Sequence, residues 1–146
     1  MNWLPSKDDQ EKARSVLAEL NLDGMRHTCV TRLSGGELQK VLIARALVQE
    51  APVLILDEPG NHLDIRNQVE ILDCIMSVTQ KRRMCTLIVL HHLNYAMRYA
   101  EKVLLLDKGR TIFSGPSSAL SASSLSKVYG IAITLRHIDG VPYALF

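Results

Sequence analysis

A short glycine-containing segment, Leu33-Ser34-Gly35-Gly36-Glu37, has the residue types that bind an anion. Glycines let a phosphate group approach the backbone closely, and the amides at the start of a helix point towards it with the favourable sign of the helix dipole. The hydroxyl of Ser34 adds another hydrogen-bond donor. The same residues also suit an ordinary helix cap and turn without a ligand, because Ser34 and Glu37 have capping-box spacing. Both interpretations predict a helix that begins at Ser34.

Two neighbouring acids, Asp57 and Glu58, follow an apolar run and suit the chemistry of phosphoryl transfer. Ligands of open α/β sheets bind where the strands end, and a carboxylate there can hold a hydrated Mg²⁺. Asp57 would hold the metal ion through water, and Glu58 would orient and deprotonate an attacking water molecule. The alternative interpretation is a pair of solvated loop acids.

Three helices are expected to position these residues, each from a capping residue followed by apolar residues at helical spacing. Ser6-x-x-Asp9 resembles a capping box before a helix over about 7–20, and Ser34 begins the second helix. Asp64 caps a third helix through about Gln80. Its inward apolar residues are expected to be Val69, Leu72, Ile75 and Met76.

Two apolar runs, Val53–Leu56 and Cys85–Leu90, are expected to be parallel strands buried on both faces and joined by the third helix. A short helix over 93–100, a strand over 103–106 and a tight turn into 111–113 are expected next. Asp139-Gly140 between two apolar stretches is a strong hairpin signal, so the chain is expected to close with antiparallel strands.

Composition indicates one ordinary folded domain of 146 residues, 47% of them apolar. The net charge of +2 is too small to indicate a nucleic acid or an anionic membrane surface as the partner. Three scattered cysteines without C-x-x-C spacing fit a reducing compartment better than a disulfide framework or a zinc site. Neither an apolar run of membrane-spanning length nor a signal-peptide pattern occurs, so no direct insertion into a membrane is expected.

Four segments follow one another in a specific order. A Leu-Ser-Gly-Gly-Glu helix precedes a strand that ends in Asp57-Glu58-Pro59, and Asn61-His62-Leu63-Asp64 and a second strand ending at His91 come next. This order resembles the ATP-binding cassette (ABC) ATPases, in which these segments are the signature motif, the Walker B strand, the D-loop and the switch histidine. Segments such as Leu90–Asn94 and the final hairpin look like the ATPase subunits of importers for iron–siderophore complexes, haem and vitamin B12.

The resemblance implies an ATP site shared between two chains. Ser34, Gly35, Gly36 and Glu37 would form the nucleotide-binding signature, which faces the γ-phosphate of ATP held by an opposite subunit. The chain would thus require a second ABC ATPase subunit, or a fragment containing a Walker A loop, as its partner.

The resemblance also assigns roles towards ATP held by the same subunit. Glu58 and His91 would be catalytic, with His91 sensing the γ-phosphate, and Asp57 would hold Mg²⁺ through water. The D-loop would comprise Asn61, Leu63 and Asp64. Asp64 can both cap its helix and meet the other subunit.

The phosphate-cradling loop of the family, G-x-x-x-x-G-K-[ST], does not occur in the sequence. The expected α/β fold is therefore a truncated P-loop NTPase core: a parallel sheet flanked by helices, with the end of the helical subdomain at the N-terminus and an antiparallel hairpin at the C-terminus. Residues 1–50 would be the end of the helical subdomain and the signature helix, and residues 51–146 would run from Walker B to the hairpin, all within one ABC ATPase domain. Gly60, usually Ser or Thr in the family, and His92, often Asp in relatives, are lesser departures.

The expected function is that of an ATP-binding and ATP-hydrolysing subunit, partial because it lacks Walker A, of an importer for iron–siderophore, haem or cobalamin. It would be cytoplasmic and peripheral to the membrane, use ATP and Mg²⁺, and work with permease subunits. The isolated chain is expected to be inactive, because Asp57 and Glu58 would have no positioned phosphate to act on.

Two alternatives remain open from the sequence. In the first alternative, the chain is a non-catalytic split-gene product or remnant that pairs with a separate Walker A-containing chain. In the second, it is a soluble ABC protein acting on ribosomes, a class that also carries Asn61-His62-Leu63-Asp64. Leu93-Asn94 and the final hairpin suit importers better.

A missing central strand has a consequence for stability. In the family, the strand that feeds the phosphate loop lies between the switch-histidine strand and the strand expected here at 103–106. Its absence would leave two apolar edges unpaired, and such edges invite association with other chains. The isolated chain is therefore expected to be poorly stable or oligomeric.

Overall fold

The computed structural model describes residues 4–138 and 140–146 of the chain. The chain divides into two compact units, which meet in sequence between Val89 and Leu90. The first unit contains, in order, α1 (Lys7–Glu19), the 3₁₀ turns η1 (Asp23–Met25) and η2 (Val30–Arg32), α2 (Gly35–Leu47), β1 (Val53–Asp57), α3 (Ile65–Arg82) and β2 (Cys85–Val89).

The three helices of the first unit begin at the predicted capping residues. Ser6 and Asp9 form a reciprocal capping box at α1, and Ser34 and Glu37 form a second one at α2. Asp64 caps α3 by accepting a hydrogen bond from the backbone N–H of Asn67. These predictions are confirmed, and the predicted ends of α1 and α3 lie within two residues of the observed ones.

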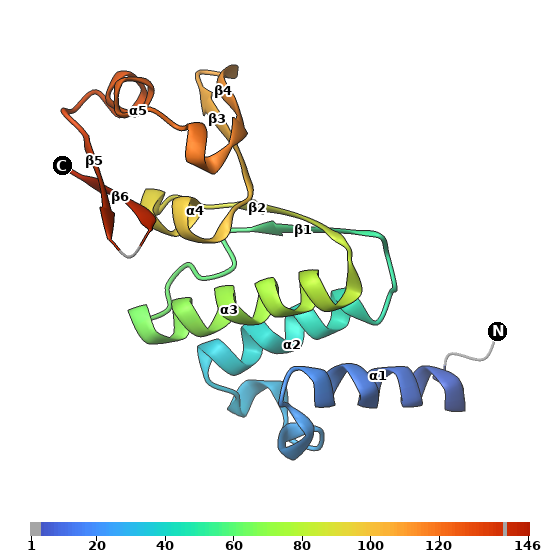
Figure 1. Cartoon of the computed structure of the whole chain (residues 1–146). Helices are drawn as coiled ribbons and strands as arrows, with labels where there is room; N and C mark the ends of the chain where they lie inside the picture. Colours follow the sequence, from blue (N-terminus) through green and yellow to red (C-terminus); the bar gives the residue numbers. More distant parts are fainter. Residues whose placement is uncertain (1–3, 139) are drawn as a thin grey trace. The chain divides into compact units, whose positions relative to one another are not determined.

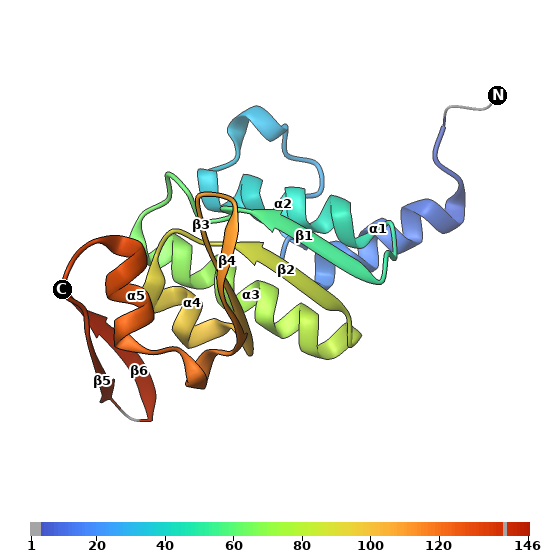
Figure 2. The ribbon, with the colours of Figure 1, turned by 90° about the horizontal axis from the view of Figure 1, so that it is seen from above.

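Strands β1 and β2 pair in parallel, with Val53 opposite Cys85 and Asp57 opposite Val89. Helix α3 connects them, which confirms the predicted parallel crossover. Figures 1 and 2 show that α1, α2 and α3 all lie on the same side of this strand pair. The core of the unit fills the space between the helices and this face of the sheet, and its buried members are Val16, Leu20, Leu22, Ile43, Ala44, Leu47, Leu54, Ile71, Ile75 and Val78.

The prediction that both strands are buried on both faces is wrong for the described residues. Leu54 is buried against the helices, but the alternate side chains point the other way and are 47% (Val53), 68% (Ile55), 54% (Leu87) and 46% (Val89) exposed. Because successive strand residues face opposite sides, helices on one side cover only every second residue. Parallel strands bury both faces only where a layer packs on each side.

The buried stripe of α3 also differs from the prediction. Leu72 and Ile75 are buried as expected, whereas Val69 and Met76 are only half-buried. Ile71 and Val78 are fully buried in their place. The stripe therefore follows positions i, i+1, i+4 and i+7, the wide apolar face of a helix that contacts two layers at once.

The second unit contains α4 (Leu93–Tyr99), β3 (Lys102–Asp107), β4 (Arg110–Pro116), the 3₁₀ turn η3 (Ser117–Ala119), α5 (Ala122–Tyr129), β5 (Thr134–Ile138) and β6 (Val141–Leu145). Its buried core consists of Met97, Leu120, Leu125, Ile133 and Ala144. Asn94 connects α4 to β6, because its side chain donates to the carbonyl of Ala144 (3.3 Å) and accepts from the same residue's N–H (2.7 Å).

Two hairpins complete the second unit, as predicted. Strands β3 and β4 are antiparallel, and Lys108 and Gly109 between them both have positive φ, the conformation that a two-residue type I′ turn requires. Strands β5 and β6 are also antiparallel, with Ile138 opposite Val141. Of their predicted turn, Gly140 has a φ of 80°, and Asp139 lies outside the described residues. Among residues 4–138 and 140–146, no helix has the length and apolar character needed to cross a bilayer.

Candidate functional site

The N-terminus of α2 is closed by an exchange of hydrogen bonds between Ser34 and Glu37. The backbone N–H of Ser34 donates to the Glu37 carboxylate (2.8 Å), and the N–H of Glu37 donates to Oγ of Ser34 (3.4 Å). The hydrogen bond from the Ser34 backbone is the main reason why the pKa of Glu37 lies below its ordinary value. Gly35 and Gly36 occupy the first two helical positions, where backbone N–H groups have no acceptor within the helix. The capping box therefore engages the backbone N–H groups of Ser34 and Glu37, and it leaves those of Gly35 and Gly36 for other acceptors.

The two glycines pack closely against the start of α3. A Cβ atom placed on Gly35 would lie 2.9 Å from Cδ2 of Leu63, and one placed on Gly36 would lie 2.9 Å from Oδ1 of Asn67. Gly36 is buried, whereas Gly35 and Ser34 are exposed. Close packing thus favours glycine at both positions, and it places the start of α2 beside the segment that leads into α3.

The two acids stand where β1 ends. Asp57 is the last residue of the strand and is exposed. Glu58 follows it with a φ of 46°, and its N–H donates to the carbonyl of Val89 at the end of β2 (3.1 Å). Non-glycine residues adopt this left-handed conformation at a cost of roughly 1–2 kcal/mol. The two acids thus lie at the carboxyl end of β1, where ligands of open α/β sheets bind.

Asn61 holds the carboxylate of Glu58. Its side-chain amide donates to Oε2 of Glu58 (2.7 Å), and its backbone N–H donates to the Glu58 carbonyl (3.0 Å). The other side-chain atom, Oδ1, accepts from the N–H of His62 (3.0 Å), so the amide orientation is determined on both sides. The predicted D-loop residue Asn61 and the predicted base Glu58 therefore form one hydrogen-bonded turn.

The remaining predicted D-loop residues connect this turn to α3. The carbonyl of Leu63 accepts from the side chain of Gln68 (3.1 Å). The Asp64 carboxylate accepts from both the backbone N–H and the side-chain amide of Asn67, each at 2.8 Å. The structure thus links Ser34–Glu37, Asp57, Glu58 and Asn61–Asp64 within the first unit. His91 belongs to the second unit, where it is exposed and precedes α4 by two residues.

A single carboxylate among the described residues suits a magnesium ion whose other ligands would be water and substrate phosphates. No set of three or more His, Cys, Asp and Glu side chains lies close enough to hold a metal ion within residues 4–138 and 140–146. Mg²⁺ usually takes one or two protein carboxylates and completes its shell with water and substrate phosphates. Asp57, an exposed carboxylate at a strand end, fits the role of the single protein group that binds such an ion through water.

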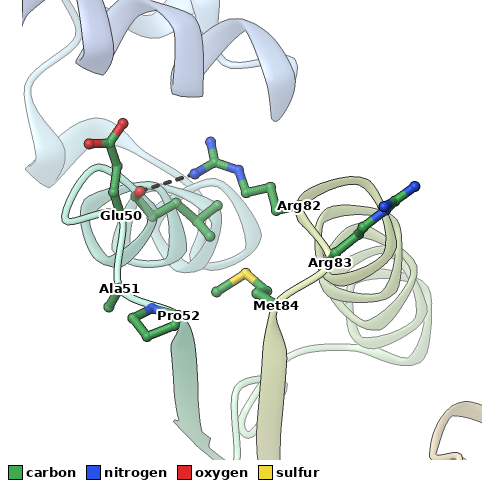
Figure 3. A pocket seen from close by; sticks show the side chains of 7 residues that line it. Glu50, Ala51, Pro52, Arg82, Arg83 and Met84 are labelled. Carbon is green, nitrogen blue, oxygen red and sulfur yellow. Dashed lines mark hydrogen bonds between the residues drawn. The ribbon is translucent and has the colours of Figure 1, made fainter.

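A different hollow, of about 290 Å³, lies at the other end of the strand pair, where Pro52 and Met84 precede β1 and β2 (Figure 3). Arg82, the least exposed of its charged residues, donates to the carbonyl of Leu47 (3.1 Å) and to the carboxylate of Glu19 (2.6 Å). Glu50 at its rim pairs with Lys12 (2.6 Å). Arg82 and Glu50 thus already have partners within the protein, and their ion pairs connect the helices beside this hollow.

Comparison with known proteins decides the family. Residues 2–61 match the family model described as ABC transporter. The whole chain superposes with a TM-score of 0.88 and 28% identity on 60% of a structure reported as an inward-facing metal-chelate type ABC transporter. The chain belongs to the ABC transporter family. The predicted family and the predicted ABC ATPase fold class are both confirmed.

Its sequence relatives are ATP-binding subunits of ABC transporters. An uncharacterized ABC transporter ATP-binding protein of Methanocaldococcus jannaschii is 39% identical over 97% of this chain and 56% of its own length. A probable siderophore transport system ATP-binding protein of Bacillus subtilis is 33% identical over 99% of this chain and 54% of its own length. A phosphonates import ATP-binding protein of Cupriavidus necator is 33% identical over 92% and 48%. The ABC chain thus spans about half the length of the curated relatives it matches.

Three functional or structural residues of the ABC chain escaped the sequence reasoning: Asn67, Gln68 and Arg82. Asn67 and Gln68 contact the predicted D-loop, and Arg82 joins the helices. A signal existed only for Asn67, which stands three residues after the capping Asp64, where a side chain can interact with its cap. The partners of Gln68 and Arg82 follow from tertiary packing.

Proposed function

We propose that this chain contributes to an ATP site that is shared between two chains. Ser34 Oγ and the amides of Gly35 and Gly36 would bind the γ-phosphate of ATP held by the partner. The observation that supports this most directly is the N-terminus of α2, where Ser34 and Gly35 are exposed at the positive end of a 13-residue helix. Its amides and dipole favour a phosphate group.

The acids at the end of β1 would act on ATP bound by the subunit to which this chain belongs. Glu58 would orient and deprotonate the attacking water, with Asn61 fixing its carboxylate at 2.7 Å. Asp57 would hold Mg²⁺, which neutralises phosphate charge when bound, through a water molecule. His91 would stabilise the γ-phosphate.

We further propose that the intact subunit serves an importer of metal chelates such as iron–siderophore, haem or cobalamin. Relatives named for siderophore transport, petrobactin import and iron chelatin transport support this, as does the metal-chelate type transporter structure. The subunit would be peripheral to the cytoplasmic membrane and would bind permease subunits. Residues 1–50 would complete a helical subdomain with the signature helix, and residues 51–146 would carry Walker B to the C-terminal hairpin.

The experiment mixes this chain with a chain that carries a G-x-x-x-x-G-K-[ST] loop and measures association by sedimentation velocity. A complex that requires ATP and Mg²⁺, and that Ser34→Arg abolishes, is the expected result. Gln80→Ala, an exposed change at the far end of α3, is the matched control. Association that is indifferent to nucleotide or to Ser34→Arg would contradict the proposal.

A turnover assay addresses the acids separately. The chain alone is expected to hydrolyse no ATP, because the proposed machinery lacks a phosphate-holding loop, and the mixture is expected to show hydrolysis that Glu58→Gln removes. Nucleotide-dependent association without turnover would instead favour the non-catalytic alternative, in which this chain serves only as a binding piece.

A further inference from the structure

We propose that Asn67 is a positioning residue for the phosphate-facing amides of Gly35 and Gly36. This inference rests on the proposed function, and it concerns a residue of α3 that lies outside the signature and the D-loop segments. Its basis is the packing of the Asn67 side chain against Gly36 together with two hydrogen bonds from Asn67 to Asp64.

The orientation of the Asn67 amide is determined by Asp64. One oxygen of the Asp64 carboxylate accepts from the backbone N–H of Asn67 and the other accepts from its Nδ2, each at 2.8 Å. Because Nδ2 is engaged with Asp64, Oδ1 is the atom that faces α2. The Asn67 side chain is thus held in one orientation between the starts of the two helices.

Gly36 packs directly against the side chain of Asn67. A Cβ atom on Gly36 would meet Oδ1, Cγ and Cβ of Asn67 at 2.9, 3.3 and 3.6 Å, so rotating the amide would not clear the contact. Gly36 is buried and Asn67 is half-buried. The Asn67 side chain therefore limits how closely the start of α2 approaches α3, and with it the position of the first amides of α2.

Gly35 provides the matched comparison. A Cβ atom there would meet only Cδ2 of Leu63, also at 2.9 Å, and this atom is the far end of a flexible side chain. Leu63 can turn aside to another rotamer, whereas Asn67 is held by its hydrogen bonds to Asp64. Two adjacent glycines with equal contact distances should therefore differ in their tolerance of a methyl group.

The stability arm of the test is a double-mutant cycle in urea. Gly36→Ala should lower the unfolding midpoint, Gly35→Ala should lower it less or raise it, and Gly36→Ala combined with Asn67→Ala should recover the loss caused by Gly36→Ala. Equal effects of the two glycine variants, or strictly additive effects at positions 36 and 67, would overturn the proposed packing role.

The binding arm uses the chain labelled with ¹⁵N-glycine and titrated with inorganic phosphate, followed by the amide signal of Gly35. Phosphate should shift this signal in the wild type. Asn67→Ala should weaken the apparent affinity for phosphate roughly tenfold, which corresponds to the loss of about one hydrogen bond between a displaced glycine amide and the phosphate. The Gly36→Ala/Asn67→Ala double variant should regain stability but not affinity, a split that a purely structural role would not produce. Gln80→Ala, which removes an amide elsewhere on α3, should change neither quantity.

The outcomes separate the two proposals. A wild-type Gly35 signal that ignores phosphate would contradict the proposed function, and the positioning role would fall with it. A wild-type response that Asn67→Ala leaves unchanged would overturn the positioning role alone. If Asn67→Ala fails to fold, Asn67→Ser is the second variant: it removes the amide that donates to Asp64 without adding a charge, and it should likewise weaken phosphate binding, whereas an unchanged affinity would overturn the positioning role.

Discussion

Individual glycines serve different purposes in this protein. Gly36 provides room for Asn67, and Gly109 provides the positive φ of 74° that its hairpin turn requires. Gly60 does neither: its φ is not positive, and a Cβ atom there would lie 3.3 Å from Cγ of Gln68, which would have to move by a few tenths of an ångström. A serine side chain should therefore fit at this position if Gln68 makes this shift.

Gly60→Ser should stabilise the protein by about 0.4–1 kcal/mol, because it restricts the unfolded chain without requiring a strained backbone. The measurement is the free energy of unfolding in urea. Gly109→Ala is the control with the opposite sign, since its positive φ penalises a side chain. A loss of stability in Gly60→Ser would show that Gln68, which also donates to the Leu63 carbonyl, cannot move aside.

The capping carboxylates should make stability depend on pH. Hydrogen bonds from Ser6 and Ser34 hold the pKa values of Asp9 and Glu37 below their ordinary values. The folded state therefore binds fewer protons than the unfolded state as the pH falls, so this stabilisation is complete above the unfolded pKa, about 4.3 for a glutamate, and is lost as the pH falls through the folded pKa.

Unfolding midpoints measured between neutral pH and acid test this dependence. Glu37→Gln and Asp9→Asn should each flatten the decline in acid, and the double variant should combine both effects because the two caps lie on different helices. A Glu37→Gln curve that runs parallel to the wild type at every pH would contradict the expected role of the cap.

These caps were predictable from the sequence because their partners lie three residues apart. Asn61 illustrates the opposite case: its place in the D-loop motif was visible, but its hydrogen bond to Glu58 required the turn to be seen. The contact of Asn67 with Gly36 joins residues of two helices and leaves no local pattern. Site residues were therefore predictable where a motif encodes them, and their supporting contacts were not.

At the scale of elements, Arg82 joins the three helices of the first unit. From the end of α3 its guanidinium donates to Glu19 of α1 at 2.6 and 3.1 Å and to the last carbonyl of α2, that of Leu47, at 3.1 Å. Both side chains of the ion pair are largely covered, with 27% and 20% of their surfaces exposed. Water therefore screens this pair less than an exposed one.

Arg82→Ala should destabilise the first unit by about 2 kcal/mol, because it leaves a partly covered carboxylate and a helix-terminal carbonyl without their donor. Arg82→Lys should recover little, since an ammonium group cannot supply the same fork of donors. Chemical denaturation measures both.

Lys12→Ala is the control for Arg82, because the Lys12–Glu50 pair has an equally short distance of 2.6 Å but is largely exposed. Exposed ion pairs contribute little to stability, so its unfolding midpoint should hardly move. Equal losses in Arg82→Ala and Lys12→Ala would contradict the role assigned to Arg82.

The elements themselves were largely predictable, and their environment was not. Apolar runs and caps located β1, β2 and the three helices because period and capping are local properties. The exposure of Ile55 and Leu87 was not predictable in the same way, because an unbroken apolar run does not reveal whether one or two layers cover the strand. The buried face of α3 was predicted one position off for the same reason, because helical spacing does not reveal how many layers the helix contacts.

At the scale of the whole molecule, the exposed apolar face of β1 and β2 should make the isolated chain associate. Val53, Ile55, Leu87 and Val89 present adjacent apolar side chains on one face of a two-stranded sheet. Contiguous apolar surface of this kind favours contact with other chains. We expect oligomers in sedimentation velocity, and we expect Ile55→Thr combined with Leu87→Thr to reduce them.

A variant on the other side of the sheet serves as the control for association. Thr86→Ser changes a residue that faces the helices and hydrogen-bonds to Thr79 (2.7 Å), so it should leave the oligomers unchanged. A monodisperse wild-type monomer with a sharp, cooperative melt would contradict the expected association.

The central claim concerns the whole assembly: the start of α2 meets the terminal phosphate of ATP that another chain holds. A photoreactive ATP with an azidoanilide on its γ-phosphate, bound to a partner that carries a phosphate-binding loop, tests it most directly. After illumination and proteolysis, mass spectrometry should find the label on this chain in the peptide containing Ser34, Gly35 and Gly36, and excess unmodified ATP should compete it away. Labelling confined to the partner, or to peptides of this chain far from α2, would contradict the claim.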